Sequence, residues 1–293
     1  MSIDLSRARV LKEDALDGRV AWITGGGSGL GRAMAERFAG LGATVAVCGR
    51  RRKPLDETVQ AIEEAGGKAL SVSLDVRDPE AVGQAAEQIV QEAGGLDILV
   101  NNAAGNFICP SEDLSPGGFD AVVKIVLYGT FYCTQAAAKS WIARKTKGVV
   151  LNIATTYVTS GSAFVLPSAA AKAGVVAMTK SLSAEWGRYD IRLNAIAPGP
   201  IPTKGAFSRL MPSPEIGERM EQRIPAGRFG DPAELAELAA FLCSDASDWI
   251  RGEMVTLDGG EYVRCAGEFN EFIDLPPEMW EAFRKKMEAA KRR

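Results

Sequence analysis

Short apolar segments alternate along the chain with longer segments of helical period. The short segments are rich in β-branched residues, as buried strands are, and the longer ones repeat apolar residues every three or four positions. Predicted strands lie at 19–24, 43–48, 69–75, 97–101, 148–154, 191–197 and 253–257. Predicted helices lie at 29–41, 54–66, 79–94, 116–143, 168–188 and 232–244. This alternation predicts an α/β fold with a doubly wound parallel sheet of about seven strands.

We expect residues 1–293 to form a single domain, because no linker and no internal repeat interrupts this pattern. Two regions depart from it. Residues 199–230 follow the sixth predicted strand and are rich in proline, and we expect them to form a lid over the ligand. Residues 263–293 form a tail that we expect to pack on the body or on a neighbouring subunit. The apolar residues at helical spacing in the tail are Met279, Trp280, Phe283 and Met287.

The composition is that of a globular protein, with 46% apolar and 24% charged residues. The net charge of −3 gives no basic excess, so we expect no nucleic-acid partner. The chain contains no histidine, which excludes histidine general bases and histidine-ligated metal sites, and we expect no metal. Its five cysteines are scattered with no C-x-x-C pair, which is typical of a reducing compartment.

Neither a targeting segment nor a membrane span is expected. Residues 1–18 carry mixed charges and lack the apolar stretch of a signal peptide. No window approaches the run of about 18 apolar residues that a spanning helix needs, so we expect no membrane partner. The cytoplasm is therefore the expected location.

A glycine-rich turn joins the first predicted strand to the first predicted helix. It reads Thr-Gly-Gly-Gly-Ser-Gly-Leu-Gly over residues 24–31. Glycines permit a tight turn and close helix–strand packing, and the free N–H groups at the helix start favour phosphate. This predicts a Rossmann-type dinucleotide site, with an ordinary strand-to-helix loop as the alternative. The predicted contacts are Thr24, Gly25, Gly27, Ser28, Gly29, Leu30 and Gly31.

The residues after the second strand indicate which dinucleotide binds. Gly49 stands near the place where an NAD-preferring site needs a carboxylate, and Arg50 opens a basic run. Guanidinium groups suit a 2′-phosphate, so we predict NADP(H), although such a run can also be a solvated face. Asp75 is predicted to contact the adenine, with Val76 beside it in the cofactor site. Asp75 could also cap the helix that begins after Asp78.

Two further segments end predicted strands. They are Asn101-Asn102-Ala103-Ala104-Gly105 after the fourth and Pro198-Gly199-Pro200-Ile201 after the sixth. Together with the glycine turn and Asp258-Gly259-Gly260, they resemble the short-chain dehydrogenase/reductase family over nearly the whole chain. The resemblance implies that Asn102 supports the sheet beneath the cofactor and that the tetrapeptide 198–201 meets the nicotinamide carboxamide. It also implies a homotetramer.

The usual active site of this family is Tyr-x-x-x-Lys with an upstream Ser and a helix Asn. Three of the four positions differ here. Ser168 occupies the tyrosine position, four residues before Lys172. Thr155 stands at the serine position and Tyr128 at the asparagine position. A serine hydroxyl is too short and too weakly acidic to replace the phenol, which argues against ordinary ketone–alcohol chemistry.

A narrower resemblance includes these substitutions. The chain looks like the 2,4-dienoyl-CoA reductases of this family at residues 102–107, Tyr157, the Ser168–Lys172 frame and residues 203–209. This implies NADPH-dependent reduction of a 2,4-dienoyl-CoA to a trans-3-enoyl-CoA during β-oxidation of unsaturated acyl chains. By this resemblance Tyr157 and Asn106 donate hydrogen bonds to the thioester oxygen. Lys172 holds the nicotinamide ribose, and Ser168 orients the site.

An acyl-CoA thioester is the partner that this resemblance implies, and its phosphates require basic groups at the entrance. The resemblance assigns that role to Arg77 and Arg209, and it lines the substrate with Phe107 and Ser115. Lys204 is a further candidate.

The residues alone leave plainer interpretations open. Asn106 could cap a loop, Tyr157 could end a strand, Ser168 could be a helix N-cap and Lys172 could be a solvated lysine. Three other functions also remain open. They are a short-chain enzyme that reduces a ketone, sugar or steroid with Tyr157 as the acid, an enoyl-thioester reductase, and an NADP-binding protein without catalysis.

Overall fold

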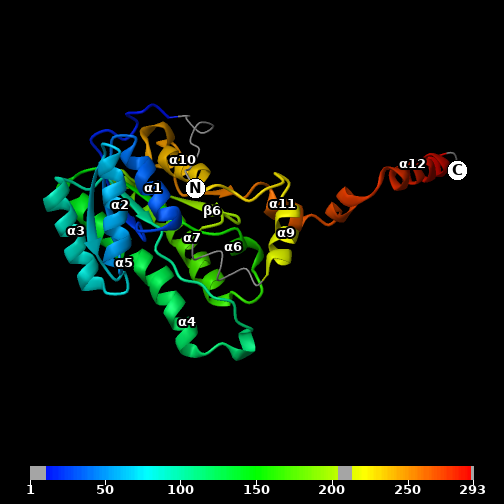
Figure 1. Ribbon diagram of the computed structural model, residues 1–293, viewed down its shortest axis with the longest axis horizontal. Helices are drawn as coiled ribbons and strands as arrows, with labels where there is room; N and C mark the ends of the chain where they lie inside the picture. The colour runs from blue at the N-terminus through cyan, green and yellow to red at the C-terminus, as the bar shows by residue number, and fades with distance from the viewer. Residues whose placement is uncertain (1–10, 204–212, 292–293) are drawn as a thin grey trace.

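A seven-stranded sheet forms the centre of the computed structural model, which describes residues 11–203 and 213–291 (Figure 1). Every neighbouring pair of strands is parallel, in the order β3-β2-β1-β4-β5-β6-β7. The strands are β1 (Val20–Thr24), β2 (Thr44–Gly49), β3 (Lys68–Ser73), β4 (Ile98–Asn101), β5 (Gly148–Ile153), β6 (Ile191–Pro198) and β7 (Met254–Leu257). The doubly wound α/β prediction and the seven predicted strands are confirmed.

The α-helices in the described residues carry the labels of Figure 1. They are α1 (Gly29–Ala39), α2 (Arg52–Glu64), α3 (Pro79–Ala93), α4 (Pro116–Val123), α5 (Gly129–Arg144), α6 (Tyr157–Ser160), α7 (Leu166–Trp186), α9 (Pro214–Gln222), α10 (Pro232–Cys243), α11 (Glu261–Ala266) and α12 (Pro277–Lys291). Shorter turns include η2 (Ser111–Asp113), η4 (Gly187–Tyr189), η5 (Asp245–Ser247) and η6 (Asn270–Asp274), and η3 (Lys124–Tyr128) is a π-helix.

Helices cover both faces of the sheet, because its central strands are apolar on both sides. In β1, successive side chains point to opposite faces. Ala21 and Ile23 belong to the core that contains buried residues of α1, α2 and α10. Val20 and Trp22 belong to the core that contains buried residues of α3 and α5. This two-sided burial accounts for the unbroken apolar character of the strand.

One long helical stretch, Pro116–Arg144, passes through α4, η3 and α5 without a break. By length and composition alone it could cross a membrane, and 44% of its most apolar window is buried within the protein. Core helices of globular proteins pass the same test. In α5, Cys133, Ala137 and Trp141 are fully buried in the core beside the sheet, as expected for such a helix.

The carboxyl ends of all the strands meet at one edge of the sheet. The chain first runs outward from β1 to β3 and then returns to place β4 beside β1. Ligands of open α/β sheets bind at the strand ends where the order reverses in this way. The predicted dinucleotide residues after β1, β2 and β4 therefore belong to one edge of the molecule.

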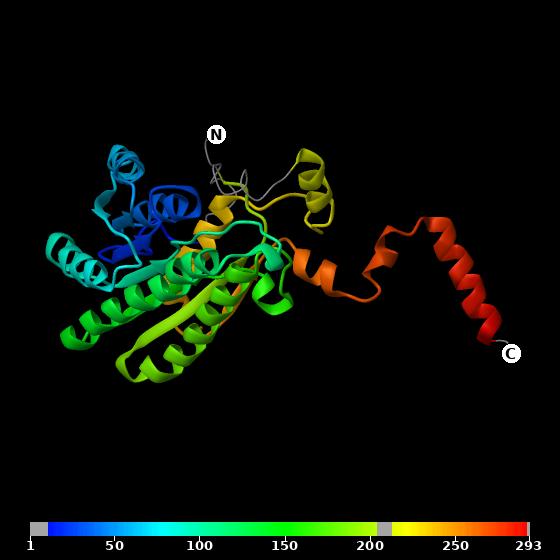
Figure 2. The same cartoon turned by 90° about the horizontal axis from the view of Figure 1, so that it is seen from below.

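The tail leaves this compact body after β7. In both views α11, η6 and α12 extend away from the sheet, and α12 ends far from it (Figures 1 and 2). Residues 1–10, 204–212 and 292–293 lie outside the described part of the chain.

A buried ion pair joins the two helices that cover one face. Arg37 of α1 and Glu237 of α10 approach to 2.6 Å, with side chains only 11% and 10% exposed. We expect Glu237→Gln to lower the free energy of unfolding by roughly 3 kcal/mol, because it leaves a guanidinium in a poorly hydrated site without a counter-charge. Urea denaturation measures this loss.

The matched control is Glu36→Gln, which breaks an equally short Arg32–Glu36 pair that is 38% and 33% exposed. An exposed pair of this kind contributes about 0–1 kcal/mol. Equal losses in the two variants would contradict the role of burial.

Candidate active site

The glycine-rich turn is clamped to the neighbouring strand by Thr24. This threonine is 1% exposed, and its hydroxyl accepts hydrogen bonds from the backbone N–H groups of Asn102 and Ala103, both at 3.0 Å. The same hydroxyl donates to the Val100 carbonyl at 3.3 Å. The Asn102 side-chain amide donates to the Thr24 carbonyl at 3.0 Å. Asn102 therefore orients the turn through its backbone and its side chain.

The turn has a backbone conformation that favours glycine at two positions. Gly25 has a φ of +67°, and a Cβ there would lie 2.9 Å from the Asn102 amide nitrogen. Gly29, with a φ of +54°, opens α1. Ser28, the N-cap of this helix, makes no side-chain capping bond, so the first N–H groups of α1 are available to an anion. The residues present therefore fit the diphosphate of a dinucleotide.

Arg50 lies exposed where β2 ends. Within the described residues Arg50 and Arg51 make no hydrogen bond or ion pair, whereas Arg52 pairs with Asp56 at 2.9 Å and Lys53 contacts Glu57 at 4.0 Å. Arg50 directly follows the last residue of β2, so it is the unpaired cation nearest to the strand end, and a guanidinium there suits a 2′-phosphate.

Asp75 and Arg77 form a local pair beside Arg50. The Arg77 guanidinium donates to the Asp75 carboxylate at 2.6 and 3.0 Å. That hydrogen bond lowers the pKa of Asp75, and the charge of Arg50 adds a smaller effect in the same direction. The alternative that Asp75 caps α3 is wrong, because Asp78 is the N-cap and accepts from two backbone N–H groups. Val76 packs against Gly129.

Three polar side chains meet beyond the end of β5. The Tyr157 hydroxyl lies 3.0 Å from the Ser168 hydroxyl. The Asn106 side-chain amide donates to the Tyr157 hydroxyl at 3.5 Å, and its carbonyl oxygen accepts from the Phe107 N–H at 2.9 Å. Asn106 therefore also stabilises its own loop, as the plainer interpretation states. The sequence-predicted Asn106, Tyr157 and Ser168 come from three separate elements and form one cluster.

Ser168 is not the helix N-cap. α7 begins at Leu166 with Val165 as its N-cap, so Ser168 lies inside the first turn and is 4% exposed. The physical reason is Pro167, which is tolerated in the first turn of a helix and so lets the helix begin before Ser168. Its hydroxyl is consequently free to meet Tyr157.

Lys172 is buried, so the interpretation as a solvated lysine is wrong. It is 6% exposed, and its ammonium donates to the Ile153 carbonyl at the end of β5. Burial lowers the pKa of Lys172 from 10.5 to about 8. The position one helical turn after Ser168 places this cation on the same side of α7 as the Tyr157 cluster.

The residues predicted to contact the substrate lie in different surroundings. Phe107 packs against the small core of Val122, Val126, Ala171 and Val175. Ser115 is the N-cap of α4, and its hydroxyl accepts from the Gly118 N–H at 3.1 Å. Arg209 and Lys204 lie outside the described residues.

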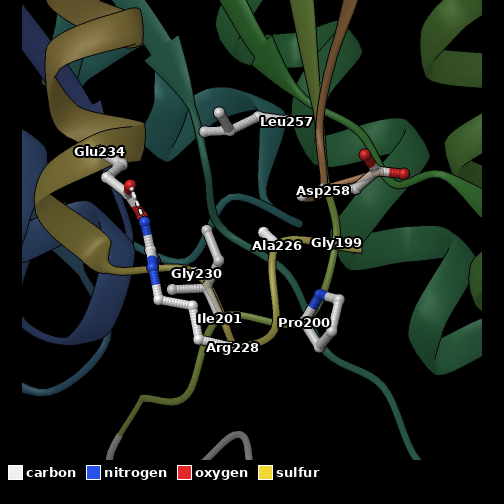
Figure 3. Close-up of a pocket in the computed structure, with 10 residues that line it drawn as sticks. Gly199, Pro200, Ile201, Ala226, Arg228, Gly230, Glu234, Leu257 and Asp258 are labelled. Carbon is white, nitrogen blue, oxygen red and sulfur yellow. Dashed lines mark hydrogen bonds and ion pairs between the residues drawn. The ribbon is translucent and has the colours of Figure 1, made fainter. Parts of the chain in front are cut away.

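Gly199, Pro200 and Ile201 line a pocket (Figure 3). None of the residues that line this pocket belongs to the Tyr157 cluster. Gly199 donates from its N–H to the Leu257 carbonyl at 2.9 Å, which joins this segment to β7. On the other side Arg228 reaches Glu234, with an ion pair of 2.6 Å. The segment predicted to meet the nicotinamide thus forms part of the pocket wall. Its lining residues are Gly199, Pro200, Ile201, Ala226, Arg228, Gly230, Glu234, Leu257, Asp258 and Gly259.

A buried polar chain behind the cluster was not anticipated from the sequence. The Asn101 amide donates to Thr134 and to Asn152, both at 2.9 Å, and the Asn152 amide donates to Thr179 at 2.8 Å. The chain ties β4 and β5 to α5 and α7. Asparagines at the ends of otherwise apolar strands were the available signal, because a buried amide needs partners.

The comparisons with known proteins cover most of the chain. A family model described as "Enoyl-(Acyl carrier protein) reductase" matches residues 25–261. A Bacillus subtilis protein named probable 2,4-dienoyl-CoA reductase [(2E)-enoyl-CoA-producing] is 49% identical over 82% of this chain and 95% of its own. The Caenorhabditis elegans probable 2,4-dienoyl-CoA reductase 3 [(3E)-enoyl-CoA-producing] is 44% identical over 86% of this chain and 83% of its own.

Solved structures give the same result for the fold. A short chain dehydrogenase from Bacillus anthracis superposes with a TM-score of 0.77 at 48% identity, over 83% of this chain and 96% of that one. An Agrobacterium tumefaciens dehydrogenase, solved with bound NADP, has a TM-score of 0.80 at 38% identity, over 87% and 100%.

The buried lysine makes stability depend on pH. Between its native pKa of about 8 and the ordinary value of 10.5, the unfolded chain binds more protons at Lys172 than the native chain does. Native stability therefore rises with pH in this window, by on the order of 3 kcal/mol in total. We expect the stability advantage of Lys172→Met over the natural chain to shrink as pH rises from 8 to 10.5, as urea titrations at several pH values would measure.

Lys180→Met is the control, because Lys180 is exposed on the same helix. Its stability difference from the natural chain should stay constant across the window. A Lys172→Met difference that is equally flat would mean that the native amine is not buried.

Proposed function

The chain belongs to the short-chain dehydrogenase/reductase family, and from this premise we propose that it reduces 2,4-dienoyl-CoA thioesters with NADPH. The observation that carries the proposal is the cluster of Asn106, Tyr157 and Ser168, in which a tyrosine from outside α7 meets the serine at the family's tyrosine position. Relatives at 44–49% identity that bear the dienoyl-CoA reductase name support the substrate class. The enzyme is thus an oxidoreductase acting on a C=C bond.

The reaction requires stabilisation of negative charge on an oxygen. NADPH supplies a hydride to C5 of the diene. The C4=C5 π electrons then form C3=C4, the C2=C3 electrons form C1=C2, and the thioester oxygen takes the charge. Tyr157 and Asn106 donate hydrogen bonds to this oxygen, and each such donor contributes roughly 3–4 kcal/mol. A proton from water at C2 completes the trans-3-enoyl-CoA.

Ser168 and Lys172 position this machinery. The Ser168 hydroxyl, 3.0 Å from that of Tyr157, fixes the direction of the phenol. Lys172 holds the nicotinamide ribose hydroxyls, and its positive charge lies near the oxygen where charge develops. The Ile153 carbonyl, which accepts from the Lys172 ammonium, restricts its motion.

The position of the product double bond has two candidates. Protonation of the dienolate at C2 gives the 3-enoyl product that we propose, and the Caenorhabditis elegans relative carries that product in its name. Protonation at C4 gives a 2-enoyl product, which the Bacillus subtilis relative carries in its name. The hydride step and the hydrogen-bond donors are the same in both cases.

NADP(H) is the cofactor. Thr24, Gly25, Gly27, Ser28, Gly29, Leu30 and Gly31 hold its pyrophosphate, Arg50 its 2′-phosphate, and Asp75 with the Val76 main chain its adenine. Asn102 and the segment 198–201 support the nicotinamide half. The solved relative with bound NADP supports this assignment.

Arg77 contacts the phosphates of the CoA group, and Phe107 and Ser115 line the thioester channel. We place the enzyme in the cytoplasm as a homotetramer. We expect no membrane partner, no nucleic-acid partner because the net charge is −3, and no metal because the chain lacks histidine.

The proposed donors are tested by two substitutions. We expect Tyr157→Phe and Asn106→Ala each to lower kcat for 2,4-hexadienoyl-CoA by roughly 10²–10³, with a much smaller effect on KM, because each removes a hydrogen bond that strengthens in the transition state. NADPH consumption measures the rate, and NMR of the product locates the double bond.

Tyr132→Phe is a matched control, because Tyr132 lies on α5 beside Tyr128 and Phe131. Its rate should be unchanged. Unaltered diene turnover in Tyr157→Phe and Asn106→Ala would refute the assigned donors. Turnover of simple ketones alone, a preference for 2-enoyl-CoA, or NADPH binding without any thioester turnover would instead favour one of the three alternative functions.

The coenzyme preference is tested at Arg50. We expect Arg50→Ala to raise KM for NADPH at least about tenfold while leaving KM for NADH nearly unchanged, because only NADPH carries the 2′-phosphate. Arg52→Ala, whose guanidinium is already paired with Asp56, serves as the control. Equal changes for the two coenzymes in Arg50→Ala would contradict the assignment.

A further inference from the structure

Large apolar side chains are exposed in the two segments that carry the polar cluster of the candidate active site. Ile108 follows Asn106 by two residues and is 45% exposed. Phe164 and Leu166 precede Ser168 by four and two residues and are 54% and 47% exposed. We call Ile108, Phe164 and Leu166 the apolar rim. Exposed apolar residues of this size beside a polar cluster are typical of a surface that a ligand covers.

A backbone hydrogen bond joins the two parts of the rim. The Cys109 N–H donates to the Phe164 carbonyl at 2.9 Å. This bond connects the segment after β4 to the segment between α6 and α7. Ile108 directly precedes the donor, so the backbones of Ile108 and Phe164 lie close together. The rim residues therefore come from two segments that lie side by side.

The backbone at Phe164 is strained. Its φ is +65°, in the left-handed region that a bulky side chain rarely adopts. The other non-glycine residues with positive φ in the described part of the chain, Lys145 and Asp190, directly follow helical segments, where this conformation ends a helix. Phe164 ends no helix, and strain of this kind concentrates at functional sites. A strained backbone beneath an exposed aromatic ring favours a role in binding over a role in packing.

The order of the proposed roles along α7 indicates which part of the substrate the rim meets. Lys172, which we place at the nicotinamide ribose, lies about 9 Å along the helix axis from Leu166. Ser168, whose hydroxyl contacts that of Tyr157, lies between them. In the proposed reaction C5 of the diene is at the nicotinamide and the thioester oxygen is at Tyr157. The direction from C5 to C1 therefore points toward Leu166, and the thioester sulfur and the arm behind it continue in that direction.

We propose that the apolar rim holds the pantetheine arm of the CoA thioester, the segment that joins the sulfur to the phosphates. This inference rests on the proposed reduction of 2,4-dienoyl-CoA and adds the part of the substrate that these residues select. The arm carries methylene and methyl groups, which Phe164 and Ile108 cover. The acyl tail beyond C5 lies on the other side of the nicotinamide, away from the rim. The rim therefore determines the preference for CoA over shorter thiol carriers.

Phe164→Gly tests the rim without disturbing the fold, because glycine adopts the left-handed backbone freely. We expect kcat/KM for 2,4-hexadienoyl-CoA to fall about tenfold, mainly through KM, because a contact remote from the reacting atoms is equally strong in the ground and transition states. The N-acetylcysteamine thioester of the same acid lacks most of the arm, so its kcat/KM should be unchanged. NADPH consumption measures both rates.

A longer acyl chain and a second variant serve as controls. 2,4-Decadienoyl-CoA should lose as much kcat/KM in Phe164→Gly as 2,4-hexadienoyl-CoA does, since the two differ only in the acyl tail beyond C5. Phe269→Gly removes an exposed ring of the C-terminal tail and should leave the rates with both thiol carriers unchanged. A larger loss with the longer acyl chain, or an equal loss with both thiol carriers, would overturn the proposal.

Binding separates this inference from the reaction. Hexanoyl-CoA has no diene to reduce, and we expect its dissociation constant, measured calorimetrically in the presence of NADP⁺, to rise about tenfold in Phe164→Gly. This rise without turnover of any diene would support the rim and refute the proposed reaction. Diene turnover with an unchanged dissociation constant would overturn the rim alone. A lower sedimentation coefficient of Phe164→Gly would mean that the rim packs against a second copy, which would also overturn it.

Discussion

The Thr24 hydroxyl connects the two strands between which the order of the sheet reverses. It accepts from two backbone N–H groups just past β4 and donates to a carbonyl of β4, and the turn after β1 takes its path from these bonds. A buried hydroxyl that is fully hydrogen-bonded adds rigidity, whereas an unpaired one would cost about 1–3 kcal/mol. The glycine cradle therefore has a fixed position relative to the backbone just past β4, from which Asn106 follows four residues after Asn102.

The second constraint is the burial of Lys172. An amine in a nearly dry site is unfavourable when charged, and its depressed pKa expresses that cost. The polar chain from Asn101 through Asn152 to Thr179 holds α7 against β4 and β5, and the Lys172 ammonium donates to the carbonyl of the next residue of β5, Ile153. Stabilisation from the core thus offsets the instability that the buried cation introduces.

The centre of the sheet could be predicted from the sequence because β1, β4 and β5 are buried on both faces, so that each reads as an apolar run. The cradle could be predicted because only glycine tolerates the backbone at Gly25 and Gly29. The start of α7 could not, because Pro167-Ser168 reads equally well as a cap and as a first turn, and the structure has Val165 as the cap and Pro167 in the first turn. The burial of Lys172 and the Asp75–Arg77 pair depend on what lies across the strand ends. Spacing along the chain contains no such information.

The replacement of the usual tyrosine by Ser168 is consistent with the chemistry of a conjugated substrate. In a ketone the carbon that receives hydride carries the oxygen, so an acid on α7 beside the ribose-binding lysine is correctly placed. In a dienoyl thioester the carbon that receives hydride and the oxygen that receives charge lie at opposite ends of the conjugated chain. The donors must then stand further from the nicotinamide than an α7 side chain does. Tyr157 on α6 and Asn106 after β4 are the groups to which we assign this role, and the Ser168 hydroxyl lies 3.0 Å from that of Tyr157.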